Sequence, residues 1–137
     1  MADTLRLEIV TPERHLVDAQ VESVQIPGLD GELGILPGHS PLISQLKPAG
    51  LLSYVQGGAT HQIVIAEGFV EVLPNQVRVL AEVAENPTEI DVERAIRARD
   101  RAEKLVSQSL TDPEVDADAA TRALARAAAR LEAAKKK

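Results

Sequence analysis

The sequence predicts an α+β fold, with an N-terminal antiparallel β-sandwich over residues 1–86 and a C-terminal antiparallel hairpin of two helices over residues 87–137. Composition changes abruptly at this boundary, because all eight glycines and both aromatic residues precede it and thirteen alanines follow it. Aliphatic runs punctuated by Gly and Pro favour strands and turns, whereas glycine-free, alanine-rich sequence favours helix. We therefore predict two domains that meet at Asn86-Pro87.

Short strands separated by turn residues make up the first domain. Leu5, Leu7 and Ile9 occupy alternate positions, which predicts a half-buried strand that ends at Thr11-Pro12. A second strand is expected over residues 21–26. Two hairpins follow, one joining residues 51–55 to 62–66 and one joining residues 69–73 to 77–80. No helix interrupts this order, so it indicates an antiparallel sandwich or barrel, with a core of Leu, Ile and Val.

Residues 31–42, which read GELGILPGHSPL, cannot form a helix because three glycines and two prolines interrupt them. Their aliphatic side chains nevertheless require burial. We expect a tight corner that presses onto the core through Leu33, Ile35, Leu36 and Leu42, with His39 at its tip.

Two helices are expected after the boundary. Thr88 and Asp91 form a capping box after Pro87, so the first helix should begin there. Its apolar residues recur at steps of three and four: Val92, Ala95, Ile96, Ala102, Leu105 and Val106. A polar interruption at Thr111-Asp112-Pro113 separates it from a second helix over about residues 116–134. The stripe of that helix consists of Ala120, Ala123, Leu124, Ala127, Ala128 and Leu131.

These stripes consist mostly of alanine, which has a physical consequence. Buried apolar surface contributes about 25 cal/mol per Å², so an alanine contributes far less than a leucine. The two helices should therefore be stable while the contact between them is weak, and the pair can open without melting either helix.

Charge and composition exclude several functions. Residues 1–86 carry four basic and eleven acidic side chains, which argues against nucleic-acid binding through this part. The chain contains no cysteine, so thiol chemistry and disulfides are excluded. No run is long enough to span a membrane, and the expectation is a soluble intracellular protein. Basic residues at 122, 126, 130 and 135–137 would meet an acidic surface or a polyphosphate, or complement the helix dipole.

Residues 31–42 closely resemble the signature segment of the epsilon subunit of the F-type ATP synthase. Residues 90–95, which read IDVERA, fit that family's motif associated with ATP binding, and Arg126, Ala127, Arg130 and Leu131 fit its second-helix pattern. The resemblance covers both domains in the expected order. It implies a non-catalytic rotor subunit of the central stalk, which couples proton flow to ATP synthesis. It also implies that the C-terminal helices inhibit ATP hydrolysis when they extend.

The resemblance also implies sites and partners. A contact with the ring of c subunits falls on Glu32, Gly34 and His39. The implied partners are the gamma subunit, the c-subunit ring and, through the helices, the catalytic alpha and beta subunits. The expected location is peripheral, at the cytoplasmic face of the cell inner membrane or the thylakoid membrane, with membrane contact only through the complex. No cofactor is required, and ATP is a regulatory ligand whose candidate residues are Glu85, Ile90, Asp91, Arg94, Arg126 and Arg130.

Simpler roles remain open for several of these residues. Asp91 also suits a helix cap, it can pair with Arg94 one turn later, and His39 suits a local turn hydrogen bond. Neighbouring His39 and Ser40 point apart in an extended turn and lack an orienting acid, so we identify no catalytic residue and no metal ligand. A phosphate loop is rejected because Pro37 and Pro41 remove two backbone donors. The alternative function is a free-standing nucleotide-sensing module with a helical hairpin.

Overall fold

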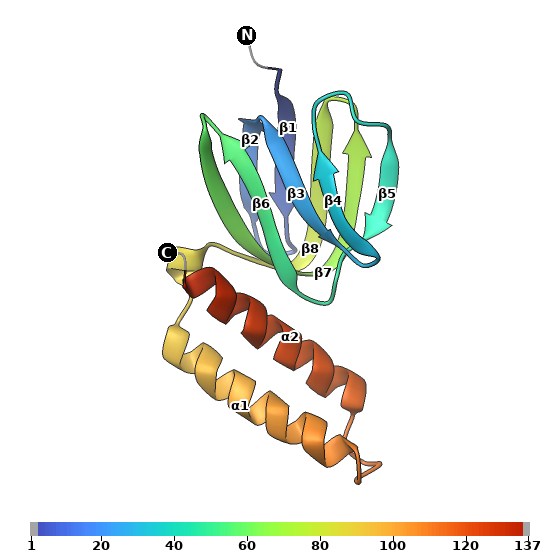
Figure 1. Cartoon of the computed structure of the whole chain (residues 1–137), viewed down its shortest axis with the longest axis vertical. Coiled ribbons are helices and arrows are strands. Elements are labelled where there is room, and N and C mark those ends of the chain that lie inside the picture. The colour runs from blue at the N-terminus through green and yellow to red at the C-terminus, as the bar shows by residue number, and fades with distance from the viewer. Residues whose placement is uncertain (1–2, 136–137) are drawn as a thin grey trace.

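The computed structural model describes residues 3–135 and contains eight strands followed by two α-helices (Figure 1). The predicted α+β fold class is confirmed. Lys136 and Lys137, which the sequence places in the basic C-terminal end, lie outside the described residues. The strands are β1 (Leu5–Val10), β2 (His15–Val21), β3 (Ser23–Gly28), β4 (Gly31–Ile35), β5 (Leu42–Gln45), β6 (Gly50–Gln56), β7 (Ala59–Leu73) and β8 (Gln76–Glu85).

The strands form a sandwich through one continuous hydrogen-bonded path, ordered β2-β1-β8-β7-β6-β3-β4, with β5 pairing to β7. The pairs are antiparallel except for β1 with β8, which run parallel. The long strand β7 belongs to both parts of the path. Its residues 59–65 pair with β6, and its residues 69–72 pair with β5. One strand therefore changes partners at residues 66–68.

The core between the layers is aliphatic, as predicted. Its fully buried members include Leu5, Leu7, Ile9, Ile26 and Leu52. Both aromatic residues lie at its margin. Phe69 is half exposed, and Tyr54 is partly buried and stacks on His61 with ring centroids 5.0 Å apart. Alternation along the strands thus buries branched aliphatic side chains on one face.

Several sequence predictions for the strands need correction. The two predicted hairpins are present, as β6–β7 and β7–β8, but residues 62–66 and 69–73, predicted as separate strands, belong to the single strand β7. Strands β2 and β5 were not predicted. The expected corner at residues 31–42 is wrong in its first half, because Gly31–Ile35 forms strand β4 and pairs with β3. The expected burial is also wrong in part. Ile35 is buried, whereas Leu36 is 64% exposed, because it follows the end of β4.

The two helices are α1 (Val92–Ser109) and α2 (Ala117–Ala134), preceded by a short 3₁₀ turn, η1 (Pro87–Glu89). The predicted cap at Thr88 is wrong. Asp91 caps α1 instead, accepting a hydrogen bond of 3.1 Å from the backbone N–H of Arg94. Asp116 caps α2 in the same way, through the N–H of Ala119. The second helix matches its predicted range closely.

The hairpin is folded against the sandwich, with α2 between α1 and the strands (Figure 1). Ala95 and Ala102 of α1 and Ala120 and Ala127 of α2 are buried. The predicted stripe of α1 is only partly covered, because Val92, Ile96 and Leu105 are each more than a third exposed. In the stripe of α2, Ala128 is exposed. Contact between the helices is therefore a narrow alanine seam.

A second apolar cluster joins the hairpin to the sandwich. Ala129 and Ala133 of α2 pack with Ile90 and with Val64 of β7. These alanines lie off the predicted stripe because α2 contacts the strands as well as α1. Within residues 3–135, no helix is long and apolar enough to cross a membrane.

Candidate functional site

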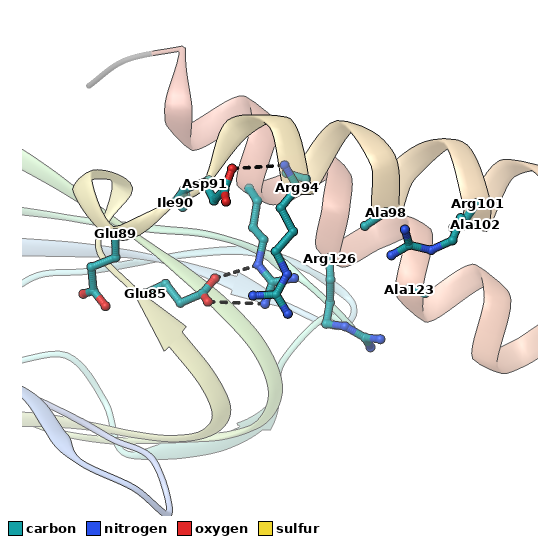
Figure 2. A pocket seen from close by; sticks show the side chains of 12 residues that line it. Glu85, Glu89, Ile90, Asp91, Arg94, Ala98, Arg101, Ala102, Ala123 and Arg126 are labelled. Carbon is teal, nitrogen blue, oxygen red and sulfur yellow. Dashed lines mark hydrogen bonds and ion pairs between the residues drawn. The ribbon is translucent and has the colours of Figure 1, made fainter.

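A cavity of about 430 Å³ lies where the hairpin meets the sandwich (Figure 2). Its walls come from the end of β8, from η1 and the residues after it, and from both helices. Small side chains create the space, because Ala95, Ala98 and Ala102 on α1 face the cavity together with Ala123 on α2. Larger residues at these positions would fill it.

The turn between β8 and α1 fixes the charged residues at one end of the cavity. The Asn86 backbone N–H donates to Glu89 Oε1 at 3.2 Å, and the Asn86 side-chain amide donates to the same oxygen at 3.0 Å. The Asp91 cap then orients the first turn of α1, from which Arg94 extends (Figure 2). Local capping chemistry therefore places carboxylates and a guanidinium beside each other.

Glu89 is also held from outside the cavity. Its carboxylate accepts a hydrogen bond of 2.8 Å from Arg14 Nη2. Burial acts to raise the pKa of the Glu89 carboxyl, but the bonds from Arg14 and Asn86 outweigh burial and hold that pKa below its usual range. Glu89 is therefore a structural anion that links β1–β2, β8 and η1.

The two arginines of α2 that line the cavity face carboxylates of the sandwich. Arg130 meets Glu85 through two bonds, Nε to Oε1 at 2.7 Å and Nη2 to Oε2 at 3.3 Å. The Nη1 atom of Arg126 lies 3.9 Å from Oε1 of Glu67. Each guanidinium keeps donors beyond those that these contacts use, since arginine has five.

Two arginines of α1 are different. Arg94 and Arg101 line the cavity, and neither side chain forms an ion pair within residues 3–135. Planar guanidinium groups bind phosphate through forked, charge-assisted hydrogen bonds. With Arg126 and Arg130, the cavity presents four guanidiniums against the three carboxylates of Glu85, Glu89 and Asp91. The arrangement therefore suits an anion that also carries hydrogen-bond donors.

The structure brings together every residue that the family resemblance implies for ATP binding. These six, Glu85, Ile90, Asp91, Arg94, Arg126 and Arg130, line this one cavity. Sequence reasoning missed Arg101 and Glu89. A signal for Arg101 exists, because it follows Arg94 by seven residues, or two helical turns, and so shares its face. A signal for Glu89 also exists, because Asn86 and Glu89 have the three-residue spacing of a capping box, and the structure forms that box.

The residues named for contact with the ring of c subunits lie elsewhere. Glu32 and Gly34 are exposed residues of β4. His39 lies in the β4–β5 connection, and Figure 1 shows this connection at the end of the sandwich away from the hairpin. The Nδ1 of His39 is 2.8 Å from the backbone oxygen of Ser40. Strand β4 therefore separates His39 from Glu32, and the three do not form one tip.

Two family models match this chain. Residues 4–87 match the family model described as ATP synthase, Delta/Epsilon chain, beta-sandwich domain. Residues 88–135 match the model of the long alpha-helix domain of the same chain. The two matches together cover nearly the whole chain, and they change over within two residues of Asn86.

Relatives and solved structures agree with this assignment. The ATP synthase epsilon chain of Solibacter usitatus is 48% identical and is covered over 100% of both chains. That of Koribacter versatilis is 52% identical, over 80% of this chain and 76% of its own length. A chain of the Euglena gracilis mitochondrial ATP synthase, solved with OSCP, F1 and the c-ring, superposes with a TM-score of 0.81 at 30% identity, covering 96% of this chain and 81% of that one. The chain therefore belongs to the epsilon chains of the F-type ATP synthase, a family of non-catalytic subunits of the central stalk.

Proposed function

We propose that this chain couples rotation to ATP synthesis and regulates ATP hydrolysis through its C-terminal hairpin. In the folded form, the hairpin lies against the sandwich and holds ATP in the cavity between them. In the extended form, the hairpin reaches the catalytic subunits and inhibits hydrolysis. ATP stabilises only the form that binds it, by RT ln(1 + [L]/Kd), so it favours the folded, non-inhibitory form.

One observation carries the ATP part of the proposal. Four arginines surround a single cavity, and two of them, Arg94 and Arg101, have no carboxylate partner within residues 3–135. Guanidiniums without ion-pair partners are available to phosphate, and Asp91 and Glu85 supply acceptors for an amino group such as that of adenine. The cavity volume of about 430 Å³ is in the usual range for small-ligand sites.

The weak seam between the helices supports the conformational part. The buried residues along that seam are alanines, and each contributes little on separation. Both helices carry their own caps, at Asp91 and Asp116, which remain when the hairpin opens. The hairpin can therefore leave the sandwich as two intact helices.

The family assignment also supports proposals for the remaining contacts. We propose that the sandwich binds the gamma subunit, and that Glu32 and Gly34 of the edge strand β4 and His39 of the β4–β5 connection meet the ring of c subunits along one edge of the sandwich. The extended hairpin would present Arg126 and Arg130 to an acidic loop of the catalytic beta subunit. The chain would then lie at the cytoplasmic face of its membrane, held there by the complex.

Calorimetric titration of ATP into the isolated full chain tests the sensor. We expect saturable binding that is lost in the Arg126→Ala, Arg130→Ala double variant. Arg97→Ala is the matched control, because Arg97 is an exposed arginine of α1 that does not line the cavity. No detectable binding at millimolar ATP would remove ATP sensing from the proposal.

Two further measurements test regulation and coupling in the assembled synthase. Deleting residues 87–137 should relieve inhibition of ATP hydrolysis, and unchanged inhibition would contradict the role of the hairpin. The double change Glu32→Ala, His39→Ala should weaken assembly or proton-coupled synthesis while leaving soluble ATPase activity intact. Normal coupling in membranes that carry this variant would leave these residues with a local structural role only.

A further inference from the structure

Glu67 has a backbone conformation that is unusual for its type. Its φ is +53°, in the left-handed region that favours glycine, and it is the only non-glycine residue with positive φ within residues 3–135. Gly68 follows with φ of +150°, and a Cβ on Gly68 would lie 1.9 Å from the backbone oxygen of Leu80. This dipeptide lies where β7 changes its partner from β6 to β5. Gly68 is explained by this close approach, but a glutamate at position 67 is not.

The Glu67 side chain reaches the hairpin. Its Oε1 lies 3.4 Å from Arg122 Nε and 3.9 Å from Arg126 Nη1. The two arginines are four residues apart on α2, so they occupy the same face of the helix. One carboxylate of the sandwich therefore contacts two successive turns of α2.

This contact lies nearer the N-terminal end of α2 than the apolar cluster and the Glu85 ion pair do. The apolar cluster with Val64 involves Ala129 and Ala133, near the C-terminal end of α2, and the Glu85 ion pair involves Arg130. Glu67 instead meets Arg122, in the first two turns of the helix. The folded hairpin is thus attached at two places along α2: one combines the apolar cluster with the Arg130–Glu85 ion pair, and the other consists of the ion pairs of Glu67.

We infer that Glu67 is a docking residue, which holds the N-terminal half of α2 against the sandwich and thereby stabilises the folded hairpin. Backbone strain that persists at one residue indicates a compensating contact, and the contact here is with Arg122 and Arg126. The inference deepens the proposed function, since it assigns a residue that sets the balance between the folded and extended forms. Arg122 does not line the cavity, so its contact with Glu67 can be tested separately from ligand binding.

The test measures docking directly in the full chain without ATP or a partner subunit. Because the chain contains no cysteine, spin labels can be attached at Gln56→Cys on β6 and Thr111→Cys in the loop between the helices, both exposed. Double electron–electron resonance then gives the distribution of distances between the two labels, from which the fractions of docked and undocked molecules follow. Failure of ATP sensing would leave these fractions unaffected, so the two proposals fail independently.

We expect Glu67→Gln to raise the ratio of undocked to docked molecules by about 2- to 5-fold, the range typical of exposed ion pairs. Arg122→Gln should act in the same direction, and added salt should reduce the difference from the parent chain. Glu71→Gln is the matched control, because Glu71 is an exposed glutamate of the same strand. The pair Glu67→Arg, Arg122→Glu should restore docking relative to Glu67→Arg alone.

Glu67→Gly separates docking from strain. It relieves the left-handed conformation, so it should raise the denaturation midpoint of the sandwich while still increasing the undocked fraction. The inference is overturned if Glu67→Gln and Arg122→Gln both give the same distance distribution as Glu71→Gln. It is also overturned if the double variant Glu67→Arg, Arg122→Glu has no larger docked fraction than Glu67→Arg alone.

Discussion

Arg130 of α2 and Glu85 of β8 form a two-bond ion pair, with Nε 2.7 Å from Oε1 and Nη2 3.3 Å from Oε2. Less than a third of either side chain is exposed. The pair joins the last residue of the sandwich strands to the helix that packs on them. It also fixes one of the four guanidiniums of the cavity, so the site and the docking of the hairpin share a residue.

Replacing Glu85 should loosen the end of α2. Glu85→Gln keeps the size of the side chain but removes its charge. We therefore expect the free energy of opening, measured from amide hydrogen exchange in residues 129–134, to fall by about 1 kcal/mol. Native-state hydrogen exchange measures this loss. Glu82→Gln is the control, since Glu82 is an exposed residue of the same strand. Equal protection in both variants would mean that the pair contributes nothing to docking.

Arg94 should matter for anion binding more than an arginine of α1 that lies outside the cavity. A charge-assisted hydrogen bond is worth about 1.5–3 kcal/mol, so Arg94→Ala should weaken ATP affinity by at least roughly 10-fold. Arg97→Ala should leave the affinity unchanged, because Arg97 lies outside the cavity. Calorimetry on both variants at one salt concentration gives the comparison. Equal affinities would exclude a phosphate contact by Arg94.

The fold could be predicted from the sequence where a pattern is local. Glycine turns and alternating aliphatic residues identified β6, β7 and β8, and the alanine-rich period identified both helices. The edge strand β2 was missed because its burial is partial and its residues do not alternate cleanly. Strand β4 was mistaken for a corner because its glycines are typical of turns, whereas pairing with β3 holds it extended.

The candidate site could be predicted only through family resemblance. Asp91 and Arg94 are one turn apart, so their proximity follows from the helix alone. The approach of Arg126 and Arg130 to Glu85 depends on how the hairpin folds against the sandwich, which no local pattern encodes. Arg14 and Glu89 are 75 residues apart and form an ion pair of 2.8 Å, which illustrates the same limit.

Gly68 should be among the least replaceable residues of the sandwich. In Gly68→Ala the new Cβ would lie 1.9 Å from the Leu80 oxygen and 2.9 Å from the Ala81 Cα, so the backbone of β8 must move. We expect the free energy of unfolding to fall by more than about 3 kcal/mol, or the chain to fail to fold. Gly57→Ala is the control. Gly57 also has positive φ but no atom within 4 Å of the added Cβ, so about 1 kcal/mol is expected. Urea denaturation followed by Tyr54 fluorescence distinguishes the two.

Acid should weaken the turn between the domains. The pKa of Glu89 is lower in the folded chain than its ordinary value of 4.5, so its contribution to stability is fully present above that value and is lost as the pH falls through the folded pKa. The stability of the parent chain should therefore drop more steeply below pH 4.5 than that of Glu89→Gln. Urea midpoints measured between pH 6 and pH 3 test this. Curves with the same pH dependence would contradict this prediction, because they would mean that protonation of Glu89 is not linked to unfolding.

A fragment of residues 1–86 should fold without the hairpin. All members of the main core cluster lie between Leu5 and Ala84, so truncation leaves that core complete. Truncation exposes Val64, which packs against Ile90 in the full chain. We expect this exposure to lower the free energy of unfolding by about 1–3 kcal/mol. A fragment ending at residue 90 keeps Ile90 and the Arg14–Glu89 ion pair, so it should recover part of that loss. Circular dichroism and urea denaturation of both fragments and the full chain measure these differences. A disordered spectrum for the shorter fragment, with a folded one for the longer, would place the domain boundary after Ile90 rather than at Asn86.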